Sequence, residues 1–296
     1  RLRMDVGKLR AGLRQASHAW RARIRFLLAT RSLHASSGPR TKSEPSLIIG
    51  LTTTPPRVGA VWATIATLLR QSVPADAVIL TVGENVFPGR RLPRSLRRLQ
   101  TRGLQVMWVP EDYGPHLKLI PLRRSYPSAT IVTVDDDVLY RNDLVHTLTQ
   151  AAAKHPGTIV GNRGWTITWS THGPAPYFSW PKSGKAGPRT GSDDLFLTGV
   201  GGVLYPPGEP RGDAILDADA AVRVAPTADD VWFWAASVAA GTPRFCTGAP
   251  YGQSNGLDGL SPALLDTNRT ENDAQIARAL RHFELEEWAR ARGIPA

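Results

Sequence analysis

The segment "IVTVDDDVLY" at residues 131–140 decides how the rest of the sequence is interpreted. Its first four residues are apolar or β-branched, which is typical of a buried strand. Three consecutive carboxylates, Asp135, Asp136 and Asp137, follow at once. Like charges this close repel each other, and a fold keeps them beside a buried strand only if their charge is compensated. The segment therefore predicts a strand that delivers acidic side chains to a cation or to a reacting group.

The segments around this strand alternate between strand and helix patterns. Short apolar runs predict strands at 46–54, 77–83, 104–110, 129–137 and 157–164. Helical spacing predicts helices at 58–72, 92–103, 116–127, 142–157 (with Asn142 as N-cap) and within 224–241. This alternation favours an α/β fold with a parallel sheet covered by helices on both faces. Ligands of such sheets bind at the carboxyl ends of the strands, where the three aspartates are expected.

Composition and missing motifs limit the class of protein. A chain of 296 residues with 42% hydrophobic and 21% charged residues can bury one large α/β core or two smaller ones. Its one cysteine, Cys246, excludes an intramolecular disulfide. The longest apolar run, residues 231–241, is too short to cross a bilayer, and no secretory signal is evident. Neither the glycine-rich dinucleotide motif nor the phosphate-loop motif is present, which disfavours those two classes.

The positive charge of the chain is concentrated in residues 1–42. The whole chain carries +11, and this segment holds eleven Lys or Arg and one acid, which leaves +1 for the remaining 254 residues. Apolar residues recur every three or four positions over residues 1–33, so we expect a basic amphipathic helix there. It would lie on an anionic membrane surface. The alternatives are packing on the body or a second subunit, a nucleic-acid arm, and a cleaved leader. Residues 34–45 are expected to be a linker, and residues 46–296 the folded body.

The aspartate cluster has the composition of a divalent metal site. Along an extended chain, side chains alternate, so Asp135 and Asp137 would point one way and Asp136 the other. Two carboxylates on one side suit Mg²⁺ or Mn²⁺, which also takes phosphate oxygens as ligands. The alternative is a solvated acidic turn or a helix cap.

A second acidic pair, Asp229 and Asp230, precedes the apolar residues of "VAPTADDVWFWAASVAAG" at 224–241. Thr227 with Asp230 three residues later resembles a capping box. Capping explains one of the two carboxylates and does not obviously explain both. A carboxylate fixed at a helix start beside an aromatic wall can act as a general base toward a hydroxyl group, and Asp230 is the preferred candidate.

A glycine-rich segment lies between the two acidic clusters. Gly199, Gly201 and Gly202 would let the backbone approach a ligand closely, although a glycine bulge in a strand is equally compatible. Aromatic residues are dense on both sides of this segment, and they could stack on a ligand ring or simply fill the core: Trp165, Trp169, Tyr177, Phe178, Trp180, Tyr205, Trp232 and Trp234.

These motifs, taken in order, resemble a glycosyltransferase of the GT-A fold, close to the family 2-like enzymes of bacterial surface-polysaccharide synthesis. The resemblance covers roughly residues 46–283. It rests on "LIIGLTTTPPRV", "GPHLKLIPL", "VTVDDDVLY", "TGVGGVLYPPG", "PTADDVWFW" and "NRTENDAQI". It implies a GT-A (Rossmann-like), mostly parallel central sheet flanked by helices.

The resemblance also implies roles for individual residues. Asp135 and Asp137 would hold the metal and the sugar-nucleotide diphosphate, and Asp230, next to Asp229, would be the base of an inverting reaction. Lys118 would stand near the phosphates. The remaining residues expected on the donor side are Thr52, Thr54, Glu84, Asp136, Gly201 and Gly202. His282 is a possible third metal ligand, although a lone histidine on a terminal helix is usually surface or packing.

The activity that the resemblance implies is metal-dependent transfer of a sugar from a nucleotide-sugar donor to a hydroxyl of a glycan or lipid-linked acceptor. Mn²⁺ or Mg²⁺ would be the cofactor, and no nucleic-acid partner is expected. From this activity and the basic tail, we expect the protein in the cytoplasm, at the inner face of the cell membrane. Two alternatives stay open. One is a metal-dependent nucleotidyltransferase, which would release pyrophosphate, and the other is a catalytically silent, membrane-associated sugar-binding module.

Overall fold

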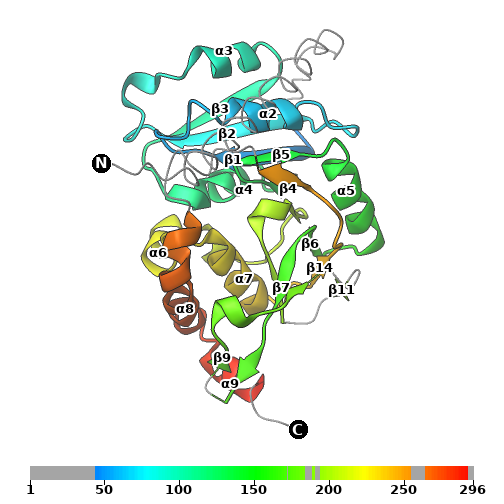
Figure 1. Ribbon diagram of the computed structural model, residues 1–296, viewed down its shortest axis with the longest axis vertical. Helices are drawn as coiled ribbons and strands as arrows, with labels where there is room; N and C mark the ends of the chain where they lie inside the picture. Colours follow the sequence, from blue (N-terminus) through cyan, green and yellow to red (C-terminus); the bar gives the residue numbers. More distant parts are fainter. Residues whose placement is uncertain (1–43, 172, 184–188, 191–193, 255–263, 293–296) are drawn as a thin grey trace, which may run out of the picture.

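The computed structural model describes residues 44–171, 173–183, 189–190, 194–254 and 264–292 (Figure 1). The expected tail helix at 1–33 and most of the expected linker lie outside the described residues. No helix among the described residues is long and apolar enough to cross a membrane.

An eight-stranded mixed sheet forms the centre of the described chain, in the order β11-β14-β6-β13-β4-β1-β2-β3. Its strands are β1 (Leu47–Thr52), β2 (Ala77–Gly83), β3 (Leu104–Val109), β4 (Thr130–Thr133), β6 (Ile159–Gly161), β11 (Arg189–Thr190), β13 (Val203–Tyr205) and β14 (Arg244–Cys246). The β1–β2, β2–β3, β1–β4 and β6–β14 pairs are parallel. In contrast, β13 runs antiparallel to both β4 and β6, and β11 runs antiparallel to β14. The expected α/β class with a mostly parallel sheet is confirmed.

Helices cover both faces of this sheet because successive strand residues point to opposite sides. On β1, Ile49 and Leu51 pack with α2, α3 and α5 on one face, while Ile48 packs with α4, α6, α7 and α8 on the other. The helices are α2 (Trp62–Leu68), α3 (Arg94–Gln100), α4 (Ile120–Ser125), α5 (Leu144–Lys154), α6 (Ala218–Val224), α7 (Asp229–Ala239), α8 (Leu264–His282) and α9 (Glu286–Arg292). Figure 1 shows α6, α7 and α8 close to one another, below β4 in this view.

Short elements surround the sheet near the carboxyl end of β4. The helical turns η3 (Gly114–Lys118), η4 (Tyr177–Ser179) and η5 (Gly199–Gly201) lie there with two small antiparallel sheets. One small sheet pairs β5 (Val138–Tyr140) with β15 (Gly252–Ser254), and the other has the order β10 (Lys182–Ser183), β7 (Gly164–Thr166) and β12 (Leu195–Leu197). A further pair joins β8 (Trp169–Ser170) and β9 (Gly173–Pro174).

Several expected element boundaries are wrong in detail. The strand expected at 129–137 ends at Thr133, and Asp136 and Asp137 form a turn. The helix expected from Asn142 has Asp143 at its N-cap position and begins at Leu144. The Asp143 carboxylate makes no capping bond and instead pairs with Arg141 at 2.8 Å. The expected cap at Asn142 is therefore wrong, and the residue at the N-cap position, Asp143, pairs with Arg141 without capping the helix.

A buried arginine fixes the connection between α4, β4 and β13. Arg123 is 7% exposed and donates to the carbonyl oxygens of Ala129 at 2.6 Å and Pro206 at 2.8 Å. It also reaches three more carbonyls, those of Pro127, Tyr205 and Glu209. A guanidinium can satisfy several carbonyls at once because it carries five N–H donors in a planar fork.

Candidate active site

The candidate site lies where the order of strands in the sheet reverses. The chain runs outward from β1 through β2 to β3, and then returns to place β4 on the other side of β1. In open α/β sheets, such a switch point opens a crevice at the carboxyl ends of the two strands, and ligands bind there. Thr52 ends β1 and Thr53 follows it, and Asp135 to Asp137 follow β4.

The turn that carries the three aspartates is held to the end of β1 by hydrogen bonds and ion pairs. Thr53 Oγ1 donates to Asp136 Oδ2 at 2.6 Å, and Thr64 Oγ1 donates to the Asp136 carbonyl at 2.8 Å. One guanidinium nitrogen of Arg57 lies 2.5 Å from Asp136 and 2.8 Å from Asp137. Burial raises the pKa of Asp136 to about 6, although the charge of Arg57 opposes this shift. Asp136 is thus a structural partner of the first strand.

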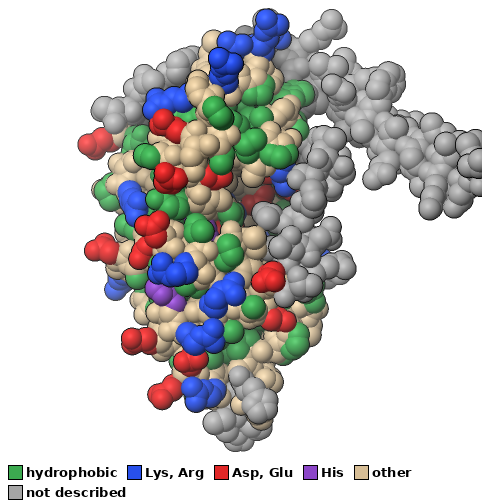
Figure 2. All heavy atoms as spheres, turned by 90° about the vertical axis from the view of Figure 1, so that its left-hand side faces the viewer, with side chains coloured by type: hydrophobic (Ala, Val, Ile, Leu, Met, Phe, Trp, Pro, Cys, Tyr) green, Lys and Arg blue, Asp and Glu red, His purple; other side chains and the backbone are tan. Residues whose placement is uncertain are grey.

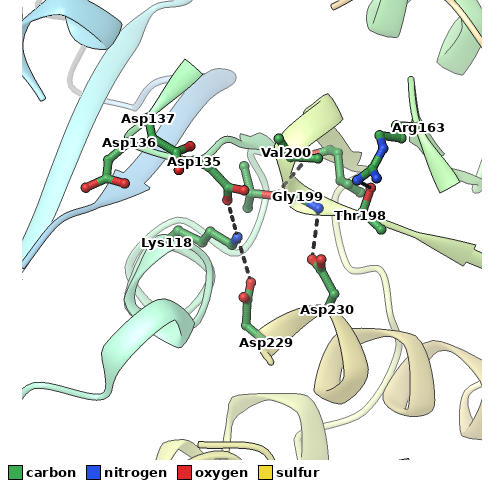
Figure 3. A network of polar contacts seen from close by, with 12 residues as sticks. Lys118, Asp135, Asp136, Asp137, Arg163, Thr198, Gly199, Val200, Asp229 and Asp230 are labelled. Atoms are coloured by element: carbon green, nitrogen blue, oxygen red, sulfur yellow. Dashed lines mark hydrogen bonds and ion pairs between the residues drawn. The ribbon is translucent and has the colours of Figure 1, made fainter. Parts of the chain in front are cut away.

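The expected strand-like alternation of the aspartates does not hold through the turn. Asp136 and Asp137 share one cation, Arg57, whereas Asp135 contacts Lys118. In Figure 3, Asp135 points toward Lys118 and Asp136 points away from it. The expectation assumed an extended chain through Asp137, and the chain leaves the sheet after Thr133.

Lys118 joins the two acidic clusters. Its Nζ lies 2.8 Å from Asp135 Oδ1 and 2.8 Å from Asp229 Oδ2, and its side chain is only 5% exposed. Burial alone would lower the pKa of Lys118, but Asp135, Asp229 and Asp230 outweigh it and raise the pKa well above its usual value. The lysine therefore stays charged and holds one carboxylate from each cluster (Figure 3).

The two carboxylates at the start of α7 have different surroundings. Asp229 is 6% exposed and bound to Lys118. Asp230 is partly exposed, and its Oδ1 accepts a hydrogen bond from the Gly199 N–H at 2.9 Å. Among the described residues, nothing bonds to the other oxygen of Asp230, Oδ2. Burial, and next the charge of Asp229, raise the pKa of Asp230 to about 8; burial also raises the pKa of Asp229.

The capping box expected at Thr227 is wrong. The N-cap position of α7 is Ala228, which makes no side-chain capping bond. Thr227 instead exchanges two hydrogen bonds with Gln275 of α8, at 3.1 and 2.9 Å. Neither Asp229 nor Asp230 is needed to cap the helix through Thr227, which leaves Asp229 for Lys118 and Asp230 for Gly199.

Gly199 is the glycine that faces both clusters. A Cβ atom there would lie 2.5 Å from Lys118 Nζ, 3.0 Å from Asp135 Oδ1 and 3.2 Å from Asp230 Oδ1. The position must therefore lack a side chain for these groups to converge.

Gly201 and Gly202, expected on the donor side, are explained by packing within the chain. A Cβ at Gly201 would lie 2.7 Å from the Cβ of Arg163. Gly202 has a φ of +76°, which disfavours other residues, and a Cβ there would lie 3.0 Å from Leu144. Gly199 is therefore the glycine of this segment that faces the two acidic clusters.

The remaining expected residues, Thr52, Thr54, Glu84 and His282, have other surroundings. The structure gives the side chains of Thr52 and Thr54 no contact with the aspartates among the described residues, and Thr53 makes that contact instead. Glu84 follows β2 and pairs with Arg90 at 2.5 Å. His282 packs on Trp232 at the end of α8, with 5.1 Å between ring centroids, so the interpretation as surface packing holds.

Four residues at the candidate site were missed: Thr53, Arg57, Tyr140 and Val200. The Asp135 N–H donates to the Tyr140 hydroxyl at 2.9 Å, and that hydroxyl donates to the Val200 carbonyl at 3.3 Å. Arg57 lies in the "PPRV" that follows the first strand. A lone basic residue just after the first strand was the signal that could have been used.

The residues present fit a divalent cation that is also bound by a ligand. Asp135 and Asp137 are 32% and 28% exposed and offer the hard carboxylate oxygens that Mg²⁺ and Mn²⁺ prefer. No group of three His, Cys, Asp or Glu side chains that could hold a metal exists among the described residues. Two protein carboxylates are nevertheless sufficient where phosphate oxygens complete the shell.

A separate groove of about 420 Å³ lies between β9–η4 and α8–α9. It is lined by residues such as Pro174, Pro176, Ile276, Leu280 and Arg290, and it shares no residue with the aspartate clusters. The convergence of carboxylates, and not this groove, defines the candidate site.

Comparison with known proteins gives weak similarities. No protein-family model matches the chain, and no curated protein sequence matches it significantly. Among solved structures, the chain is similar to the mannosyltransferase PcManGT from Pyrobaculum calidifontis in complex with GDP-Man and Mn²⁺, at 12% identity and a TM-score of 0.43, covering 96% of this chain and 87% of that one.

Two further structures show similarities of the same strength. One is a CMP:2-keto-3-deoxy-manno-octonic acid synthetase complexed with CTP, at 13% identity and a TM-score of 0.41, covering 77% of this chain and 97% of that one. The other is S. aureus TarS 1–349, at 9% identity and a TM-score of 0.43, covering 82% and 72%. Similarities of this strength do not assign a function, which is argued below from the site itself.

Proposed function

We propose that the protein is a glycosyltransferase that moves a sugar from a nucleoside-diphosphate sugar to a hydroxyl group of a glycan or lipid-linked acceptor. The observation that carries the proposal is the convergence of two acidic clusters on one lysine and one glycine at the switch point of the sheet. In this proposal, the arrangement would serve as a diphosphate site with a separate base close to it.

The carboxyl ends of β1 and β4 form the donor side in this proposal. Asp135 and Asp137 would hold Mn²⁺ or Mg²⁺ together with the diphosphate, and a bound metal would supply Lewis-acid stabilisation of the departing phosphate oxygens. Lys118 keeps Asp135 oriented and adds a positive charge behind it. Arg57 fixes the turn through Asp136 and Asp137.

Asp230 is the base in this proposal. Its Oδ1 is held by the Gly199 N–H, which orients the carboxylate and leaves Oδ2 for the proton of a hydroxyl. A pKa of about 8 suits a base that works near neutral pH. Asp229 is bound to Lys118 and positions that lysine.

The reaction then follows from these positions. The acceptor oxygen forms a bond to the anomeric carbon while the bond from that carbon to the diphosphate oxygen breaks. The bonding electrons leave with the nucleoside diphosphate, and the hydroxyl proton moves to Asp230. Attack from the side opposite the leaving group gives inversion at the anomeric carbon.

The basic tail adds a location to the proposal. With +10 of the +11 net charge in residues 1–42, attraction to an anionic membrane surface would bring the body to a lipid-linked or membrane-proximal acceptor. We accordingly propose a peripheral position at the inner face of the cell membrane.

Donor hydrolysis in the absence of acceptor tests the proposed activity. UDP-, GDP- and dTDP-sugars are incubated with Mn²⁺ or Mg²⁺, and free nucleoside diphosphate is measured for the wild type, Asp137→Asn and a control, Arg98→Gln, on the exposed side of α3. We expect release from at least one donor, loss in Asp137→Asn and no change in the control.

Two outcomes would replace the proposal. Pyrophosphate released from a nucleoside triphosphate and a sugar phosphate, without nucleoside diphosphate, would indicate a nucleotidyltransferase. Binding of sugar without turnover of any nucleotide would indicate a silent sugar-binding module.

A further inference from the structure

A small antiparallel sheet next to the proposed base carries two cations on one aromatic ring. On β7, the Trp165 ring lies 5.1 Å from the guanidinium carbon of Arg163 and 5.5 Å from Lys182 Nζ. Lys182 of β10 is the register partner of Trp165, so the two side chains stand next to each other across the strands. Tyr177 packs edge-on against the same indole, with 5.9 Å between ring centroids.

Within the described part of the chain, these two cations have no acidic partner. Among the described residues, neither Arg163 nor Lys182 lies within ion-pair distance of a carboxylate, while Lys118 and Arg57 are each paired with two. Arg163 is partly buried, and its Nη1 donates to Thr198 Oγ1 at 3.1 Å. Most of its five N–H donors therefore have no partner among the residues that the structure describes.

Arg163 is connected to the proposed base through Thr198 and Gly199. Thr198, which Arg163 holds, precedes Gly199, and the Gly199 N–H holds Asp230. The Thr198 N–H also donates to the Arg163 carbonyl at 3.1 Å. Figure 3 shows Arg163 and Thr198 on one side of Gly199, with Lys118 and Asp135 on the other. On the side of Gly199 away from the proposed diphosphate site, Arg163 thus carries a positive charge that no described carboxylate balances.

Tyr177 lies within electrostatic reach of both groups. Burial raises the pKa of Tyr177, Asp230 raises it further, and Arg163 lowers it. Tyr177 therefore lies near both Arg163 and Asp230, and its ring extends the aromatic surface of Trp165 that supports Arg163.

We propose that Arg163 and Lys182, supported by Trp165, form an anion-binding subsite for the acceptor. The ligand is a phosphate or carboxylate group carried by the acceptor, close to the hydroxyl that attacks. Arg is suited to this because its planar fork can stack on an aromatic ring and still bind phosphate or carboxylate with two hydrogen bonds. This inference rests on the proposed function, since it makes the neighbouring Asp230 the base for that acceptor.

Binding of small anions to the full chain tests the subsite. The probes are glycerol 3-phosphate for the phosphate arm and glucuronate for the carboxylate arm, with glycerol and glucose as their neutral counterparts. Ligand-observed NMR titrations are run on the wild type, Arg163→Gln, Lys182→Gln and the double variant. Arg98→Gln, which removes one exposed charge from α3, is the matched control.

We expect one or both anions to saturate the wild type and the neutral probes not to bind. Each single variant should lower the affinity for the anion at least about threefold, and the double variant more than about tenfold, because charge-assisted hydrogen bonds are lost. The arm that saturates identifies the acidic group. Lys182 is exposed, so its variant stays informative even if Arg163→Gln disturbs folding.

Three results would overturn the subsite: equal binding of anions to the double variant and the wild type, equal binding of the neutral probes, or an equal loss in Arg98→Gln. Weakened binding of UDP or GDP by Arg163→Gln would assign the cations to the donor and also overturn it. Anion binding that depends on both cations, in a protein that releases no nucleoside diphosphate, would retain the subsite and reject the transferase.

Discussion

At the scale of single residues, the site depends on how two neighbouring carboxylates differ. Asp229 is buried and bound to Lys118, whereas Asp230 is partly exposed and held by one backbone N–H. Burial and the charge of Asp229 favour the protonated form of Asp230. Adjacent acids thus have different contacts, one as the partner of a lysine and the other, the proposed base, as the acceptor of a backbone N–H.

The pH dependence of transfer tests the role of Asp230. A base must be deprotonated to accept the hydroxyl proton, so kcat/KM should rise with pH and level off above about 8. Asp230→Asn should lower kcat by about 10²–10⁴-fold, the usual contribution of a general base, and should leave the affinity for the nucleoside diphosphate nearly unchanged. A variant that transfers sugar at the wild-type rate would show that Asp230 is not the base.

The pH dependence of the free energy of unfolding is a second test of the raised pKa of Asp230. The pKa of Asp230 is higher in the folded state than in the unfolded chain, so the folded state keeps a proton that the unfolded chain has lost. The free energy of unfolding should therefore fall from about pH 4 to about pH 8, and Asp230→Asn should reduce this fall. Urea unfolding at pH 5, 7 and 9 measures it. Parallel curves for both proteins would contradict the raised pKa.

A methyl group at Gly199 tests the convergence of the two clusters. Gly199→Ala would place Cβ 2.5 Å from Lys118 Nζ, and the lysine cannot move away without leaving its two carboxylates. We expect donor hydrolysis to fall at least about tenfold because positions shifted by an ångström cost that much or more. Gly59→Ala is the control, since a Cβ there meets nothing within 4 Å. Equal activity of the two variants would contradict the geometry.

At the scale of elements, the short strand β4 determines where the aspartates lie. It ends at Thr133, and the chain then turns so that Asp136 and Asp137 reach Arg57 after β1. Antiparallel β13, beside β4, leads back from η5 and so brings Gly199 to the same end of the sheet. Elements separated by many residues in sequence thus meet at one edge.

Arg123 should be necessary for this arrangement of α4, β4 and β13. Arg123→Met would leave up to five backbone carbonyls without their donor. We expect the free energy of unfolding to fall by about 3 kcal/mol, the upper range for buried polar groups left without partners. Urea unfolding measures it, with Arg98→Met on the exposed side of α3 as the control, expected to change by about 0.5 kcal/mol or less. Equal changes would show that Arg123 has no special role.

Elements with a repeated pattern could be predicted from the sequence, and those without one could not. β2 spans the expected residues 77–83, because its residues are all buried and bounded by turn residues. β13 has only three residues between a glycine and two prolines, too few for any period, and its antiparallel direction depends on its neighbours. Strands of that length are defined by pairing and not by sequence.

The candidate site could likewise be predicted only in part. Asp135, Asp137 and Asp230 stand out because acids beside apolar runs are unusual. Thr53 and Tyr140 look like ordinary strand residues, and their hydrogen bonds to the aspartate turn appear only when β1, β4 and β5 come together. Which glycine faces the site also required the position of Lys118.

At the scale of the whole molecule, the charge divides into a basic tail and a nearly neutral body. Figure 2 shows acidic and basic side chains interspersed over one face of the described chain. This fits the +1 left for residues 43–296 and gives the body no single-signed face in that view. Attraction to a surface of opposite charge should therefore depend on the tail.

Deletion of residues 1–42 should abolish most binding to anionic vesicles. Cosedimentation with phosphatidylglycerol-containing vesicles at low and physiological salt measures it, and pure phosphatidylcholine vesicles are the control. Because each basic residue near an anionic surface contributes about 1 kcal/mol, the loss should be large and salt-dependent. Unchanged sedimentation of the shortened protein would show that the tail does not bind membranes.

The most direct test of the central claim is a crystal structure with UDP or GDP and Mn²⁺, in which anomalous scattering locates the metal. The account predicts a manganese peak in contact with Asp135 and Asp137, and the diphosphate at the carboxyl ends of β1 and β4. Metal or nucleotide bound elsewhere, for example in the groove of about 420 Å³ between β9–η4 and α8–α9, would contradict it.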